Sequence, residues 1–283
     1  MKLIVRMPFV ALLYIPLTLH AGCEHLFVAQ HMPQLQVKAM QVRTTALCFQ
    51  EYALLYSGLT RTPVWVGEHL TRAQIQGAQR IKRNNAFHEE SRLPEADRST
   101  LADYSRSGFD RGHMAPAGDF STLASQHESF SMANMAPQHP ANNRGIWEAL
   151  ESQTRELALQ KGEVYVVSGP IFEGERLKRL NGRVLVPVKF FKAVHVPATG
   201  VTGAWIVNNA PGREVEVKSL DQLEALSGIR AFPGLSAAQR STAGMLPEPD
   251  GKRSSPRMQL PKREDDDWYA QLLRWLRALR DAL

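Results

Sequence analysis

The sequence has too little glycine and proline for a collagen-like chain, with 19 glycines and 17 prolines among its 283 residues. It shows no internal repeat, and its two cysteines allow at most one disulfide within the chain. With 43% hydrophobic residues, 22% charged residues and a mean hydropathy of −0.29, it is too polar for a polytopic membrane protein and too apolar for a wholly disordered one. The class that remains is a globular protein of two domains, or of one large α/β or α+β domain.

Basic residues outnumber acidic ones, 34 to 28, which gives a net charge of +6 and a pI near 9.4. Such a balance permits a polyanionic partner, such as nucleic acid or an anionic surface, without requiring one.

Residues 1–22 have the pattern of a secretory signal peptide. Lys2 and Arg6 precede an apolar stretch, 8–19, that is shorter than the roughly 18 residues of a membrane span, and small residues follow up to Gly22. We therefore predict export, to the periplasm or the medium, with cleavage near Gly22. Removal of Lys2 and Arg6 would lower the net charge from +6 to +4, so the basic bias of the mature chain is modest.

Both cysteines lie after the predicted cleavage site. In an oxidising compartment the simplest arrangement is one disulfide between Cys23 and Cys48, which closes a loop of about 25 residues and stabilises the fold by roughly 3 kcal/mol. Two unpaired thiols are an alternative. Another is that Cys23 accepts a lipid, although His20 stands three positions before it, where an aliphatic residue is expected.

Short apolar runs rich in β-branched and aromatic residues alternate with amphipathic segments through the middle of the chain. Gly and Pro separate the runs, as is typical of strands, and steps of three and four residues indicate helices. The pattern predicts an α+β fold with a mixed or antiparallel central sheet flanked by helices. We expect strands at 47–49, 52–58, 62–66, 163–169, 189–196 and 204–208, and helices at 143–160 and 219–226.

The character of the chain changes near its C-terminus. We predict a main domain over residues 23–245, a Pro- and charge-rich linker over 246–263 and an amphipathic helix over 264–283. The acidic start of this helix opposes the positive end of the helix dipole, and an apolar stripe runs along one side. The simplest expectation is that this stripe packs against the helix's own domain. The alternatives are that it forms a homodimer contact or binds a membrane surface.

A segment from Asp103 to His113 concentrates side chains that carry chemistry. Its eleven residues include two acids, two arginines, a tyrosine and a histidine, with two glycines that allow tight turns. A helix start follows thirty residues later, where Asn143, Glu151 and Arg155 are spaced eight and four residues apart. At 3.6 residues per turn, this spacing puts an amide oxygen, a carboxylate and a guanidinium close to one helix face.

Residues 110–113, Asp-Arg-Gly-His, resemble the DRGH motif of the DNA/RNA non-specific endonucleases, the ββα-metal group that includes secreted bacterial nucleases and mitochondrial endonuclease G. The resemblance implies a ββα-metal finger at the active site of the 23–245 domain. It also implies hydrolysis of DNA and RNA phosphodiester bonds with little sequence or sugar specificity, leaving 5′-phosphate ends. The similar segments lie between about residues 52 and 235, at 107–119, 134–138, 143–155 and 167–172.

The resemblance assigns a role to each central residue. His113 is implied to be the general base that takes a proton from water. Asn143 is implied to be the only protein ligand of a divalent ion, Mg²⁺ with Mn²⁺ as a substitute, whose other positions are filled by water. Glu151 would hold water bound to that ion, and Arg155 would anchor a phosphate. The neighbouring Asn142 is the alternative ligand, but the eight-residue step to Glu151 favours Asn143.

The family also places an arginine that stabilises the transition state upstream of the motif. We choose Arg83, which lies 27 residues before Asp110 and ahead of an aromatic residue; Arg80 and Arg92 stay open as alternatives. Asp110 is expected to support the finger. The arginines expected to bind substrate are Arg111 and Arg144.

Contacts to phosphate read no base edges, so such a site would accept DNA and RNA as substrates without regard to sequence. The alternative function is a catalytically weak nucleic-acid-binding or uptake protein on the same fold. Every expected catalytic residue type is present, which favours the enzyme. A phosphodiesterase for another substrate and a toxin domain neutralised by a partner are further alternatives, and the sequence indicates no inhibitor protein.

Overall fold

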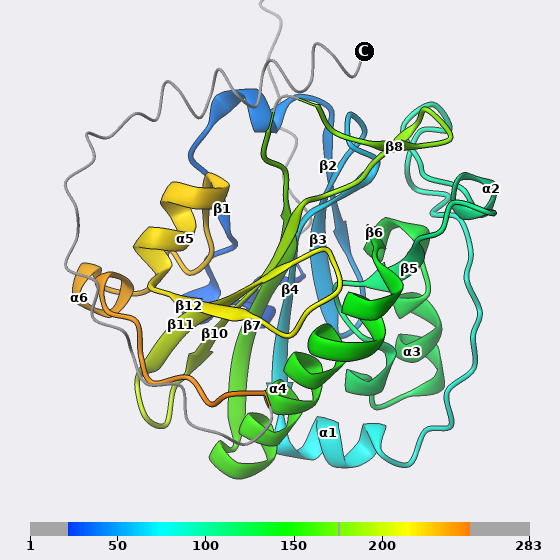
Figure 1. Cartoon of the computed structure of the whole chain (residues 1–283). Helices are drawn as coiled ribbons and strands as arrows, with labels where there is room; N and C mark the ends of the chain where they lie inside the picture. The colour runs from blue at the N-terminus through cyan, green and yellow to red at the C-terminus, as the bar shows by residue number, and fades with distance from the viewer. Residues whose placement is uncertain (1–21, 175, 250–283) are drawn as a thin grey trace, which may run out of the picture.

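The computed structural model describes residues 22–174 and 176–249, and its centre is a seven-stranded sheet (Figure 1). Neighbouring strands are all antiparallel, in the order β12-β11-β10-β7-β4-β3-β2. The expected α+β fold with an antiparallel central sheet is confirmed. The strands are β2 (Thr44–Cys48), β3 (Tyr52–Ser57), β4 (Thr62–Thr71), β7 (Glu163–Ile171), β10 (Lys189–Val196), β11 (Val201–Asn208) and β12 (Val215–Lys218).

The central strands are buried on both faces because each face is covered by a separate apolar core. Every residue of β10 except Lys189 is buried, and its side chains alternate between the two cores. Phe190 and Val194 belong to the core under α4, whereas Phe191 and Ala193 belong to the core on the opposite face. This two-sided burial explains why the strands read as nearly continuous β-branched and aromatic runs.

Different helices cover the two faces (Figure 1). The helices α1 (Arg72–Ala78), α3 (Leu123–Ser129) and α4 (Glu148–Lys161) lie on one side. The other side carries α5 (Leu220–Ser227), the short α6 (Ala237–Ser241) and a two-stranded pair of β1 (Gln34–Leu35) with β13 (Ile229–Arg230). The expected helix near 219–226 is confirmed as α5, with Ser219 as its N-cap. Helices α1 and α3 were not predicted.

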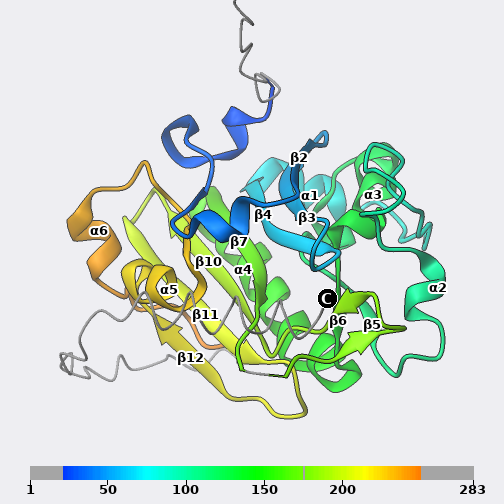
Figure 2. The ribbon, with the colours of Figure 1, turned by 90° about the horizontal axis from the view of Figure 1, so that it is seen from above.

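A separate hairpin beside the main sheet carries the DRGH residues. Strand β5 (Asp110–His113) pairs antiparallel with β6 (Met135–Gln138), and the chain then enters α4, so the expected ββα finger is present. Both views place the hairpin near the short α2 (Leu101–Tyr104) (Figures 1 and 2). A second small hairpin consists of β8 (Arg179–Leu180) and β9 (Val184–Leu185).

The prediction of one α-helix from residue 143 to 160 is wrong at its start, because residues Asn142–Trp147 form a wider π-helical turn before α4. Asn142 is held from both sides, since its side chain bonds to Gln138 and to the main chain of Asn208. Gly145 adds no side chain to the turn. Irregular turns of this kind are frequent at functional sites.

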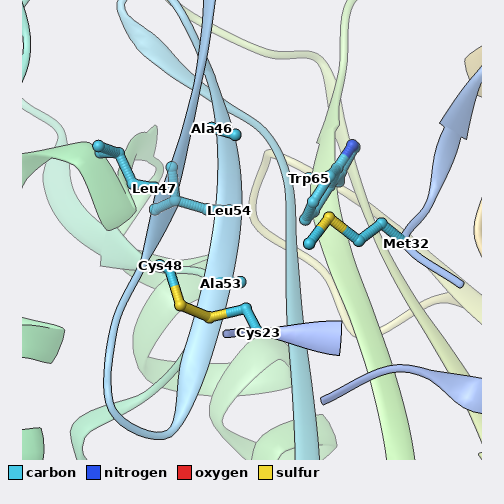
Figure 3. A pocket seen from close by; sticks show the side chains of 8 residues that line it. All are labelled: Cys23, Met32, Ala46, Leu47, Cys48, Ala53, Leu54 and Trp65. Atoms are coloured by element: carbon cyan, nitrogen blue, oxygen red, sulfur yellow. A yellow bond between two sulfur atoms is a disulfide. The ribbon is translucent and has the colours of Figure 1, made fainter. Parts of the chain in front are cut away.

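The disulfide between Cys23 and Cys48 is present, with the two Cα atoms 5.9 Å apart. It ties the N-terminal segment to β2, next to Leu47, Ala53 and Trp65 (Figure 3). The predicted pairing is therefore confirmed, and neither cysteine is a free thiol in this structure.

Packing continues past residue 245. Leu246 is fully buried in the core under α4, and Trp205 donates a hydrogen bond to the Pro247 carbonyl at 3.3 Å, so the first residues of the predicted linker belong to the packed domain. Residues 250–263 of that linker, the predicted helix 264–283 and nearly all of the predicted signal peptide lie outside the described residues. Within residues 22–174 and 176–249, none of the helices has the length and apolarity of a membrane span.

Candidate active site

A cleft between the β5–β6 finger and α4 brings together all eight side chains expected from the motif and its surroundings. They come from four places in the chain: the segment before α2, strand β5, the π-helical turn and helix α4. The eight are Arg83, Asp110, Arg111, His113, Asn143, Arg144, Glu151 and Arg155.

His113 ends β5 with its ring inside the wall of the cleft. The side chain is buried, and its ring packs against Phe87 and Phe130 with centroid distances of 5.6 and 5.0 Å. Burial, with the nearby cations Arg83 and Arg111, lowers the pKa of His113 to about 3. Its buried Nε2 has no hydrogen-bond partner among the described residues. The imidazole is therefore neutral at ordinary pH, with one ring nitrogen uncommitted.

The two neighbouring asparagines have different surroundings. Nδ2 of Asn143 donates to Asp110 at 2.9 Å, and no hydrogen bond within the described chain uses its Oδ1. In Asn142 both ends of the amide are engaged: Oδ1 accepts from Gln138 and Nδ2 donates to the Asn208 carbonyl, each at 2.6 Å. Only Asn143 thus offers an amide oxygen, the type of ligand that Mg²⁺ prefers.

Asp110 holds a second residue as well. Its carboxylate accepts two hydrogen bonds from Arg144, Nε to Oδ2 at 2.9 Å and Nη2 to Oδ1 at 2.7 Å. These bonds raise the pKa of Arg144, whose side chain is 70% exposed, so its outer N–H groups still face solvent. Arg111 lies over the Phe87 ring, 4.2 Å from its centroid. Phe130 carried no sequence signal, and Phe87 entered the sequence analysis only as the aromatic residue that follows Arg83.

Of the three candidate upstream arginines, only Arg83 lines the cleft. It lies over Phe130 at 5.3 Å, and its Nε donates to Asn85 at 2.9 Å. Arg92 is instead paired with Glu90 at 2.8 Å, with its guanidinium over the ring of Phe49, outside the cleft.

Helix α4 supplies the last two side chains. Arg155 pairs with the buried Asp119 at 2.8 Å and also donates to Ser152 at 3.0 Å, which fixes its guanidinium at the edge of the cleft. Burial raises the pKa of Glu151 to about 7, and the ammonium of Lys192 is the largest effect that opposes this rise. Asp119 and Lys192 were not predicted; the only signal for Lys192 was a cation inside an apolar strand.

The side chains of the cleft suit a metal ion that has few protein ligands and keeps most of its waters. In the described part of the chain, no group of three or more His, Cys, Asp or Glu side chains could hold a metal by itself. Mg²⁺ keeps most of its waters and needs few protein oxygens. The uncommitted Oδ1 of Asn143, with the Glu151 carboxyl in the same cleft, fits that requirement.

Residues 34–238 match the family model described as DNA/RNA non-specific endonuclease. The chain belongs to this family. The chain is 35% identical to Nuclease C1 of Cunninghamella echinulata var. echinulata over 217 residues, which cover 70% of this chain and 85% of that protein. It is 34% identical to the mitochondrial Nuclease EXOG of Homo sapiens over 215 residues, 68% of this chain but only 58% of the human protein.

A solved structure of EndoG in complex with EndoGI, described as showing the mechanism of EndoG inhibition, has a similar fold. The TM-score is 0.60 with 26% sequence identity, and the match covers 70% of this chain and 89% of that chain. The fold therefore agrees with the family match. The resemblance found in the DRGH segment is confirmed at the level of the family.

Proposed function

We propose that this protein is an exported, divalent-cation-dependent endonuclease that hydrolyses DNA and RNA with little sequence or sugar specificity and leaves 5′-phosphate ends. The observation that carries the proposal is the cleft itself: a neutral imidazole with an uncommitted Nε2 and an amide oxygen without a protein partner line one cavity, among four arginines.

In this mechanism Nε2 of His113 accepts the proton of the attacking water. Its neutral state suits a base, because a protonated imidazole could not accept that proton. The cations Arg83 and Arg155 face the same cavity and would stabilise negative charge that develops on the phosphate. Arg111 and Arg144 would bind neighbouring phosphates. None of these groups reads a base edge, which is why the chemistry would tolerate any sequence.

Asn143 would hold a divalent cation directly and Glu151 through water, and Asp110 would orient the Asn143 amide. When bound, Mg²⁺, or Mn²⁺ in its place, would supply positive charge at the scissile phosphate and at the leaving 3′ oxygen.

Export is part of the proposal because the disulfide Cys23–Cys48 suits an oxidising compartment. Fractionation of the producing cells tests it: we expect the mature chain in the periplasm or the medium, beginning near Gly22. Recovery of the full-length chain in the cytoplasm would contradict export.

The decisive experiment digests single- and double-stranded DNA and RNA across a Mg²⁺ titration, followed by analysis of the product ends. We expect all four substrates to be cut only with the cation, giving 5′-phosphates. Cleavage of small diesters with intact DNA and RNA would instead indicate another phosphodiesterase. Binding without cation-dependent cleavage would favour the alternative of a catalytically weak nucleic-acid-binding protein, which the completeness of the cleft disfavours.

A further inference from the structure

Two ionisable side chains lie in the middle of the sheet, on the face covered by α4. Glu68 of β4 is fully buried, and neither of its carboxyl oxygens has a hydrogen-bond partner among the described residues. Lys192 of β10 is 1% exposed, and its Nζ donates to the hydroxyl of Ser168 on β7 at 2.9 Å. Burying such groups is strongly unfavourable unless they are paired, so packing alone does not account for them.

Glu68 and Lys192 interact electrostatically with the ionisable side chains of the cleft. Burial raises the pKa of Glu68, of Asp119 and of Glu151, and Lys192 opposes the rise in all three. Arg155, paired with Asp119, opposes it in all three as well, and Arg83 opposes it at Glu151. Of these three cations, Lys192 is the one that does not line the cleft.

Lys192 is also connected to the catalytic finger. Its Nζ lies 4.9 Å from the ring centroid of the fully buried Trp147, at the end of the π-helical turn. The indole Nε1 of Trp147 donates to the main-chain oxygen of His113 at 3.1 Å. A cation–π contact and one hydrogen bond therefore link the ammonium in the sheet to the backbone of the proposed base.

We propose that Lys192 is a positioning residue for the nuclease reaction. It fixes Trp147 against the His113 backbone, and its charge balances two acidic side chains: Asp119, which holds Arg155, and Glu151 itself. The proposal rests on the proposed function but assigns a role to a residue outside the DRGH segment and outside α4. Lys192 does not touch the substrate, so its loss changes the turnover step rather than substrate binding.

The test compares Lys192→Met, which keeps the length of the side chain but removes the ammonium, with two control variants. We expect kcat on a DNA duplex to fall by about tenfold or more while KM changes by less than about threefold, because groups that act at the scissile phosphate are displaced, whereas Arg111 and Arg144, which would bind the neighbouring phosphates, are not. Val194→Ala, in the same strand and core, destabilises the sheet through a cavity without removing charge. Lys189→Met removes a partly exposed cation from the same strand. Both controls should keep the wild-type kcat below their melting temperatures.

Trp147→Phe provides a test that does not require Lys192→Met to fold. Phenylalanine keeps an aromatic ring beside the Lys192 ammonium but lacks the N–H group that donates to the main chain of His113. We therefore expect kcat to fall again, with KM little changed. A wild-type kcat in Trp147→Phe, or in folded Lys192→Met, overturns the proposal. The proposal is also overturned if Val194→Ala, when destabilised as much as Lys192→Met, loses as much kcat. Wild-type protein that cuts neither DNA nor RNA would overturn the proposed function itself, which is a distinct result.

Discussion

The carboxylate of Asp110 accepts a hydrogen bond from Nδ2 of Asn143 at 2.9 Å. An ionised carboxylate can only accept hydrogen bonds, so it faces the NH₂ end of the amide, and the Asn143 oxygen at the other end is left without this partner. Partners that orient a metal ligand in this way typically contribute 10- to 100-fold to metal affinity.

Asp110→Ala should therefore raise the Mg²⁺ concentration needed for half-maximal activity by about 10- to 100-fold. Arg144→Ala is the matched control, since it removes the other partner of Asp110 and leaves the bond to Asn143 intact. The Mg²⁺ dependence of cleavage by both variants is the measurement. A half-saturation that is unchanged in Asp110→Ala would show that the carboxylate does not orient the ligand.

The two adjacent asparagines should respond oppositely to substitution. Asn143→Ala removes the uncommitted amide oxygen and should abolish cation-dependent cleavage while leaving the melting temperature close to that of the wild type. Asn142→Ala breaks two buried hydrogen bonds and should lower the free energy of unfolding by about 1–3 kcal/mol, with a much smaller loss of activity in the folded protein than Asn143→Ala. Cleavage assays and thermal melts decide between them, and the opposite order would move the metal ligand to Asn142.

The lowered pKa of His113 makes a prediction about stability. An unfolded histidine binds a proton near pH 6.5, whereas burial and the nearby cations Arg83 and Arg111 lower the pKa in the folded state to about 3. The unfolded state therefore binds more protons in this window, and the contribution of His113 to stability is lost as the pH falls from 6.5 toward 3. The upper limit is about 4–5 kcal/mol.

Denaturant unfolding of the wild type and of His113→Asn between pH 7 and pH 4 measures this contribution. The wild type should lose more stability on acidification than the variant. The carboxyl groups with raised pKa values have the opposite pH dependence, but they are present in both proteins and do not contribute to the difference. Parallel stability curves would refute the lowered pKa.

The raised pKa of Glu151 predicts the pH dependence of activity. Because His113 stays neutral far below pH 7, its protonation does not limit activity in the neutral range. Burial raises the pKa of Glu151 to about 7, so kcat/KM should fall as the pH decreases below that value and the carboxylate is lost. Glu151→Gln should be much less active with no decline in this range. Persistence of the same decline in the variant would assign it to another group.

The sequence predicted six of the seven strands of the main sheet but missed β12, and it named side chains that the structure brings into one cleft. Runs such as 189–196 are rich in β-branched and aromatic residues, and the eight side chains predicted from the DRGH segment and its surroundings line one cleft. The short helix α1 was missed because its apolar face consists of little more than Ile75 and Ala78. The π-helical turn was missed because its geometry depends on the contacts of Asn142 with β6 and β11.

The residues that surround the site could not be predicted because they reach it through tertiary contacts between distant segments of the chain. Glu68 and Lys192 come from strands more than a hundred residues apart, and in the sequence each reads only as a charge within an apolar run. The pKa of His113 depends on the rings of Phe87 and Phe130, which bury it from separate segments of the chain. Burial and pairing of this kind follow from the folded arrangement and not from local pattern.

In the proposed mechanism, His113 and a cation held at Asn143 act together on one phosphodiester. Plasmid nicking by the wild type and by His113→Ala, each with Mg²⁺ and with EDTA, measures whether both are needed. We expect EDTA to stop the wild type, and His113→Ala to reduce kcat by about 10²- to 10⁴-fold while DNA binding stays intact. Nicking by His113→Ala at the wild-type rate, or nicking by the wild type that continues undiminished in EDTA, would contradict it.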